Sequence, residues 1–216
     1  MPYPRCERRE WIPPSRCTTN SCQAGSHGIL IRMAMEDDSG TLVRLATAED
    51  VPALSELISA SVRELQAEDY TMTEREGALG SVFGVDPVLI GDRTYFVAVL
   101  ESQLCACGGW SRRATPFGTG RSPARDDSVL DPRRDAARIR ALFVHPSQAR
   151  MGLGTRILKA CEEGAKSAGF KQAELTATLT GAKLFRTHGY LVVEAIRLPL
   201  ENGEALDLLR MRKQLV

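Results

Sequence analysis

The sequence lacks a long apolar run, an excess of either charge and a secretory signal. No segment approaches the roughly 20 apolar residues that a membrane-spanning helix needs, so no membrane partner is expected. The 28 Lys and Arg residues are balanced by 27 Asp and Glu residues, which leaves a formal net charge of +1. Nucleic acid is therefore not an expected partner, and any anion site has to be local. Ile29-Leu30-Ile31 is too short for the apolar core of a signal peptide, which favours a soluble cytoplasmic protein.

The six cysteines do not form a metal-binding pattern. Cys6, Cys17, Cys22 and His27 lack the short paired spacing of a zinc knuckle, so no metal is expected. Cys161 falls inside a predicted amphipathic helix, where a cysteine usually packs as a small buried hydrophobe. The sequence therefore predicts neither a metal centre nor a cysteine nucleophile.

Residues 1–40 differ in character from the rest of the chain. They contain Pro2, Pro4, Pro13 and Pro14, several arginines and no sustained apolar period. Such a segment buries too little apolar surface to offset the entropy lost on ordering, so we predict a disordered tail. Residues 41–216 are predicted to form one domain, because a chain of 216 residues suits one α/β domain better than two.

Apolar periodicity after residue 41 predicts the element order β-α-α-β-β-β-α-β-α-β-β, an α/β (α+β) fold. The first helix carries an apolar stripe from Val51 to Leu65, and the second is predicted to begin near Thr73 with Glu76 as its capping partner. The other predicted segments are a strand at 42–45, a hairpin over 95–110, a long loop over 111–136, a strand at 139–144, a helix at 154–168, a strand at 172–177, a helix at 181–187, and strands near 190–198 and 205–211.

A glycine turn joins the predicted strand at 139–144 to the helix at 154–168. It reads Gln148-Ala149-Arg150-Met151-Gly152-Leu153-Gly154. Unpaired backbone N–H groups and the positive end of the helix dipole make such a helix start an anion site, for which a diphosphate is the natural guest. A dinucleotide fingerprint needs a third glycine where this chain has Ile157, and the Gly-Lys-Ser/Thr of a nucleotide-hydrolysing loop is absent. A tight turn without a ligand remains the alternative.

The surroundings of the turn resemble the acetyl-CoA-binding motif of the GNAT (GCN5-related N-acetyltransferase) superfamily. The similar segment runs from Arg138 through His145-Pro146 to Gly169-Phe170, and Leu184 to Tyr190 resembles the family's last short helix and its following turn. The resemblance extends over Thr41 to Leu215. It implies the GNAT fold, with a central mixed, mostly antiparallel sheet flanked by helices.

The resemblance also implies an activity, namely transfer of an acetyl group from acetyl-CoA to a primary amine of a small molecule or peptide, without a metal. A non-catalytic coenzyme A-binding regulatory or sensor protein is the alternative, and a homodimer is compatible with either. Splayed strands would open an acyl pocket near Leu142 and Thr176. The cofactor-binding residues that it implies are Leu142, Phe143, Val144, Gln148, Ala149, Arg150, Met151, Gly152, Leu153, Gly154, Thr155, Thr178 and Phe185.

Two positions depart from the family pattern. Many members place a tyrosine acid where this chain has Phe185, and some place a glutamate base where it has Arg138. Tyr70 and Tyr190 are candidates to replace that acid.

No base is assigned by the resemblance. The connection that normally borders the acceptor groove offers the catalytic candidates Glu68, Asp69 and Tyr70, with Glu64 as a further carboxylate. Trp110 and Arg112 are predicted to form an aromatic and cationic rim for the acceptor. The alternative for Trp110 is packing on the apolar face of the sheet.

Overall fold

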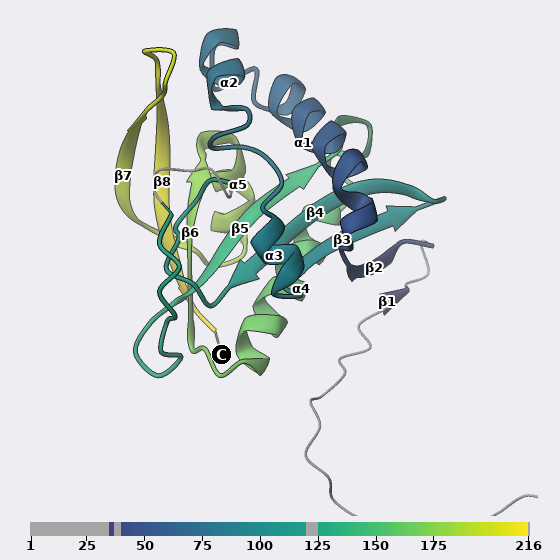
Figure 1. Ribbon diagram of the computed structural model, residues 1–216, viewed down its shortest axis with the longest axis vertical. Coiled ribbons are helices and arrows are strands. Elements are labelled where there is room, and N and C mark those ends of the chain that lie inside the picture. Colours follow the sequence, from purple (N-terminus) through teal and green to yellow (C-terminus); the bar gives the residue numbers. More distant parts are fainter. Residues whose placement is uncertain (1–34, 37–39, 120–124, 216) are drawn as a thin grey trace, which may run out of the picture. The chain divides into compact units, whose positions relative to one another are not determined.

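The computed structural model describes residues 35–36, 40–119 and 125–215. Its strands form one eight-stranded sheet in the order β1-β2-β3-β4-β5-β6-β8-β7 (Figure 1). Neighbouring strands are antiparallel except β5 and β6, which are parallel. The predicted mixed, mostly antiparallel sheet is confirmed. The strands are β1 Met35–Glu36, β2 Leu42–Leu45, β3 Tyr95–Leu100, β4 Gln103–Ser111, β5 Ala137–Val144, β6 Gln172–Thr178, β7 Leu191–Pro199 and β8 Ala205–Gln214.

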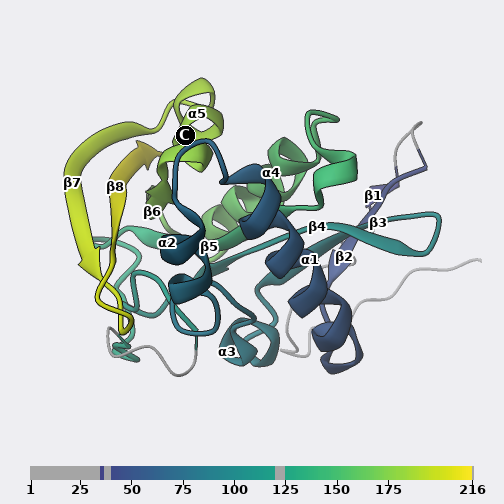
Figure 2. The ribbon, with the colours of Figure 1, turned by 90° about the horizontal axis from the view of Figure 1, so that it is seen from above.

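The helices cover the two faces of this sheet separately. One face carries α1, α2 and α3, and the other carries α4 and α5 (Figures 1 and 2). A separate buried cluster lies on each face, one including Leu54, Ile58 and Phe143 and the other including Ile157 and Leu175. The helices are α1 Val51–Leu65, α2 Met72–Ala78, α3 Pro87–Gly91, α4 Leu153–Ser167 and α5 Leu179–Thr187, with short 3-10 turns η1 Ala48–Asp50 and η2 Pro146–Gln148.

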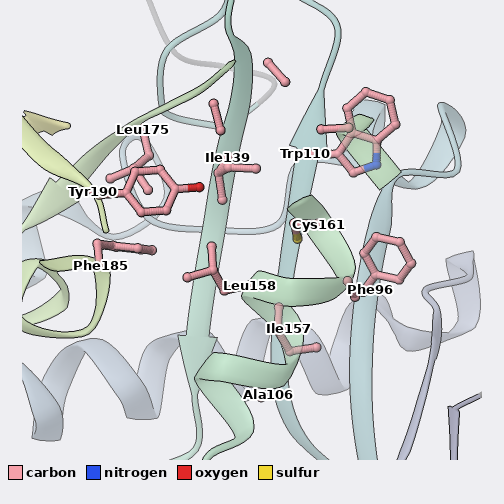
Figure 3. Close-up of a cluster of buried hydrophobic side chains, with 14 of the residues drawn as sticks. Phe96, Ala106, Trp110, Ile139, Ile157, Leu158, Cys161, Leu175, Phe185 and Tyr190 are labelled. Carbon is pink, nitrogen blue, oxygen red and sulfur yellow. The ribbon is translucent and has the colours of Figure 1, made fainter. Parts of the chain in front are cut away.

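The long helices form where the apolar spacing predicts them. In α1 the buried side chains include Leu54, Ile58 and Val62, which repeat at helical spacing and face the sheet. In α4 the buried stripe includes Ile157 and Cys161 (Figure 3). The reading of Cys161 as a buried hydrophobe is confirmed. Burial raises the pKa of its thiol well above the usual range.

The start of the second helix corrects a prediction. Helix α2 begins at Met72, with Thr71 as its N-cap. The Glu74 amide donates to the Thr71 hydroxyl at 3.2 Å, and the Glu74 carboxylate accepts from the Thr71 amide at 2.7 Å. The helix thus begins one residue before Thr73, and the capping pair lies two residues earlier than predicted. Glu76, the expected capping partner, instead pairs with Arg63 at 2.6 Å. Helix α3 is absent from the prediction because its five residues are too few to show an apolar period.

The predicted tail lies mostly outside the described residues, as do Cys6, Cys17, Cys22 and His27. Met35–Glu36 is the exception, because it pairs with β2 as strand β1. The described part of the predicted loop over 111–136 contains one isolated bridge, between Arg113 and Val129. Within the described ranges, no helix is both long enough and apolar enough to cross a bilayer.

Candidate functional site

The sheet opens between β5 and β6. These two strands pair only over Ala137–Ile139 and Ala173–Leu175. Beyond that point β5 stays paired with β4 as far as Val144, and β6 stays paired with β8 as far as Thr178. The register of β4 and β5 also shifts here, and Ala141 takes a positive φ of 52°. The predicted splay of the two strands is therefore present.

A cleft passes through this opening. Its walls include Leu142 and Phe143 of β5 and Thr176 of β6, so the expected pocket near Leu142 and Thr176 is present. Leu184 and Phe185 line it from α5 on one face of the sheet, and the chain around Gln66 and Phe83 lines it on the other. Its open volume, counting the part exposed to solvent, is about 810 Å³. The cleft therefore connects the two faces of the sheet.

The glycine turn forms the start of α4. Gly152 is the N-cap residue, with a φ of 80°, and Arg150 takes a φ of 67°. Gly152 has no side chain to cap the helix, and the hydrogen bond from the Arg156 amide to the Gly152 carbonyl measures 3.1 Å. The amides of the first turn precede this bond and have no helical acceptor, so they are available to an anion.

The two glycines of the turn have different structural roles. A Cβ at Gly154 would lie 3.1 Å from Cδ2 of Leu184 and 3.5 Å from Cγ2 of Val144, so this glycine allows α4 to approach α5 and β5. A Cβ at Gly152 would meet no atom of the described residues within 4 Å, but its φ is one that side chains rarely adopt. Packing therefore explains Gly154, whereas Gly152 leaves open space in front of the helix start.

The free edge of β5 is defined by alternation of its backbone groups. The His145 amide donates to the Cys105 carbonyl at 2.8 Å, so the amide of Val144 points away from β4 toward the opening. Phe143 lies opposite Cys107, and its backbone groups face β4. Val144 is thus placed to pair with an extended ligand. Phe143, which was also expected to bind the cofactor, lines the cleft but has its backbone groups turned to β4.

Tyr70 does not have the free hydroxyl that a catalytic acid needs. Its oxygen donates to the Asp207 carbonyl at 2.6 Å and accepts from the Leu179 amide at 2.9 Å. Burial raises its pKa to about 12. These bonds tie the connection after α1 to α5 and β8, so we assign Tyr70 a structural role and correct its prediction as a catalytic residue.

The carboxylate candidates stand at different places. Asp69 accepts a 2.5 Å hydrogen bond from the Thr180 hydroxyl, which places it beside the start of α5. Glu68 and Glu64 are exposed. None of the three is among the described residues that line the cleft. Thr178 does line it, and its hydroxyl caps α5 by accepting from the Gly181 amide at 3.0 Å.

The two positions that depart from the family pattern have structural partners. Phe185 lines the cleft and packs edge-on against Tyr190, with ring centroids 5.7 Å apart. Tyr190 is buried in the cluster under α4, outside the cleft lining, and burial raises its pKa far above the usual range (Figure 3). It is therefore not placed to replace the missing acid. Arg138 forms an ion pair with Glu174 across β5 and β6.

Trp110 corrects a further prediction. Trp110 lies in the buried cluster of Figure 3. It is 8% exposed, and its ring packs edge-on against Phe170, with centroids 6.2 Å apart. A Cβ at Gly164 of α4 would lie 2.4 Å from its Nε1. The ring is thus held beneath α4, as in the packing alternative, and does not form an acceptor rim. Arg112 is exposed and does not line the cleft.

Two polar residues of the cleft were missed from the sequence. Gln66 ends α1 and is 5% exposed. Arg140 is 6% exposed, lies 2.9 Å from Asp86 and donates to the Gly118 carbonyl at 2.6 Å. Alternation in β5 sets Arg140 on the side opposite the buried Ile139, which is a signal that could have directed attention to it. Gln66 gives no such signal, since a polar residue at a helix end is usually solvated.

Comparisons with known proteins agree with this architecture. The model of the acetyltransferase (GNAT) family matches residues 59–190. Among solved structures, the chain is similar to a GCN5-related N-acetyltransferase from Rhodopseudomonas palustris, with 22% identity, a TM-score of 0.60, and coverage of 80% of this chain and 94% of that one.

Two further structures contain the cofactor. The PaiA N-acetyltransferase from Thermoplasma acidophilum, in complex with coenzyme A, has 15% identity and a TM-score of 0.55, covering 81% of this chain and 98% of that one. YncA from Salmonella typhimurium, with acetyl-CoA, has 17% identity and a TM-score of 0.56, covering 82% and 95%. No curated protein matches. At these identities the likeness shows the fold.

Proposed function

Because the chain belongs to the acetyltransferase (GNAT) family, we propose that it transfers an acetyl group from acetyl-CoA to a primary amine of a small molecule or peptide. The observation that carries the proposal is that the helix start at Gly152 lies beside the cleft between β5 and β6, because Leu184 and Leu142 line the cleft and lie within 4 Å of a Cβ at Gly154. An anion at the helix start and an extended arm in the cleft suit one ligand with a diphosphate and a long chain.

The residues present fit coenzyme A. First-turn amides of α4 would bind the diphosphate, and the open space at Gly152 would admit it. Arg150 is exposed at the same turn and would add a charge-assisted contact. The free edge of β5 at Val144 would pair with the pantetheine arm, and Leu142 and Phe185 would line its path. Acetyl-CoA when bound would supply the acetyl group as a thioester.

The chemistry proposed is direct transfer in one ternary complex. The amine nitrogen bonds to the thioester carbonyl carbon, the carbon–sulfur bond breaks, and the proton lost by the nitrogen ends on the coenzyme A thiol or in solvent. The chain's main contribution is positioning, since the opening holds two reactants together. A backbone amide at the β5 edge would stabilise the negative charge that develops on the carbonyl oxygen.

The test combines binding with turnover. We expect calorimetry to detect acetyl-CoA binding, and a thiol-release assay against a panel of amines to exceed the hydrolysis background with at least one acceptor. Mass spectrometry should then identify the N-acetylated amine. A protein that fails to bind acetyl-CoA would contradict the proposal at its first step.

A second candidate is a coenzyme A-binding sensor without turnover. It is favoured by Phe185, which has no hydroxyl, and by Tyr70, whose hydroxyl is held by two backbone groups. The same assays separate the candidates, because a sensor binds acetyl-CoA yet gives neither thiol release nor acetylated product with any amine.

A further inference from the structure

The part of the cleft on the α1 side is where the second reactant would enter, and this step rests on the proposed function. The diphosphate turn lies at the start of α4, on the other face of the sheet (Figures 1 and 2). On the α1 side the walls come from the end of α1, the connection between α2 and α3, and the loop after β4. They surround an opening that leads to the same strands that would hold the thioester.

Gln66 lines this part of the cleft and is buried. It is 5% exposed, and its Oε1 has no hydrogen-bond partner among the described residues. Leaving a buried acceptor unpaired is unfavourable, so the position is suited to a donor brought by a ligand.

The backbone of Gln66 is held rigidly. Its carbonyl accepts from the amides of Asp69 at 3.2 Å and Tyr70 at 3.0 Å. Tyr70 is in turn bonded to Asp207 and Leu179. The side chain of Gln66 therefore extends from a turn that is hydrogen-bonded to both β8 and α5. A binding residue needs such support.

The walls around Gln66 are mostly apolar, and the one charge in the described lining is neutralised by an ion pair. Phe83 and Phe143 pack edge-on, with centroids 6.0 Å apart, and Phe117 of the loop lines the same cleft. Among the described lining residues, Arg140 is the one charged side chain. Its guanidinium faces Asp86, and its Nε has no described partner. A second cationic group on an acceptor would therefore lose its hydration against apolar walls, with no carboxylate among the described lining residues to pair with.

We propose that Gln66 binds the acceptor amine, whose N–H donates a hydrogen bond to Oε1 of Gln66. The acceptor is then a monoamine with an apolar or aromatic body. Aromatic walls favour such a body, and the lack of a carboxylate among the described lining residues disfavours diamines and polyamines.

The experiment uses the full chain loaded with coenzyme A, and it measures binding before turnover. The probes are 2-phenylethylamine and 1,4-diaminobutane, each titrated by calorimetry. We expect the first to bind at least about tenfold more tightly, because it carries one charge and an aromatic body. Gln66→Met keeps the length of the side chain and removes the carbonyl. It should weaken 2-phenylethylamine binding by roughly tenfold and leave coenzyme A affinity unchanged.

Gln103→Met is the matched control, because Gln103 is exposed at the start of β4 and does not line the cleft. It should change neither affinity. Thermal unfolding of both variants checks that they fold. Gln66→Glu adds a second measurement, since a carboxylate there should shift preference toward the diamine.

Each outcome decides the matter. The inference is overturned if the diamine binds as tightly as 2-phenylethylamine or more tightly, or if neither amine binds. It is also overturned if folded Gln66→Met binds 2-phenylethylamine with unchanged affinity. If the wild type binds 2-phenylethylamine through Gln66 but releases no thiol with any amine, the inference holds and the transferase proposal fails. If the wild type acetylates amines and Gln66→Met does so with unchanged KM, the proposed function holds and the role of Gln66 fails.

Discussion

Replacing Gly152 by aspartate would put a negative charge where we place the cofactor diphosphate. A side chain at this position meets nothing within 4 Å, so it would project into open space in front of α4. The positive φ of 80° adds strain for any side chain, although Asp and Asn tolerate this region better than most residues. Gly152→Asn is therefore the matched control, because it has nearly the same shape and strain without the charge.

The magnitude follows from the charge alone. Two like charges about 5 Å apart repel by about 1–3 kcal/mol when the effective dielectric constant lies between about 80 and 20. Gly152→Asp should therefore bind acetyl-CoA about 5- to 150-fold more weakly than Gly152→Asn. Salt should shrink this ratio, because the Debye length falls from about 10 Å at 0.1 M to about 3 Å at 1 M.

Calorimetric titration of acetyl-CoA at two salt concentrations measures the ratio. Gly203→Asp, in the turn between β7 and β8, controls for the added charge, because Gly203 also has a positive φ and open space around it. Equal acetyl-CoA affinity of Gly152→Asp and Gly152→Asn at low salt would refute the placement of the diphosphate at this helix start, whatever the activity of the variants.

Three further predictions concern stability. Tyr70→Phe leaves the Leu179 amide without its acceptor, and urea unfolding should show a loss of about 1–3 kcal/mol in the free energy of unfolding. The pH–rate profile below pH 9 should keep its shape, because the pKa of Tyr70 is about 12. Gly164→Ala should lower the melting temperature because its Cβ would meet Trp110, whereas Gly91→Ala, with open space around it, should not; equal effects would contradict this packing.

The third concerns Asp50, whose pKa is lowered chiefly by its hydrogen bond with Arg44 at 2.7 Å. A carboxyl group whose pKa is lower in the folded than in the unfolded protein stabilises the fold at pH values above its unfolded pKa. That stabilisation is lost as the pH falls through the folded pKa. The stability difference between wild type and Asp50→Asn should therefore shrink as pH falls from 6 to about 3. A constant difference in urea unfolding over that range would exclude the ion pair as its source.

Local patterns were enough to predict the scaffold of the site. The apolar stripe of α4 and the glycines before it are neighbours in sequence, and the structure keeps them together at one helix start. The role of Tyr70 was not predictable in this way, because its partners Leu179 and Asp207 come from α5 and β8, far along the chain. Trp110 failed as a rim residue because β4 continues to Ser111, and alternation sets its ring with Gly108 under α4.

The short pairing of β5 with β6 makes the interruption of the sheet a boundary line between two blocks of strands. Three register pairs join the block β1–β5 to the block β6–β8, and the Arg138–Glu174 ion pair crosses the same line. A ligand that pairs with the free edge of β5 therefore also completes the protein's own secondary structure. Ligand binding should therefore also stabilise the fold locally. As the ligand saturates the chain, the protection of the β5 and β6 amides from hydrogen exchange should rise together.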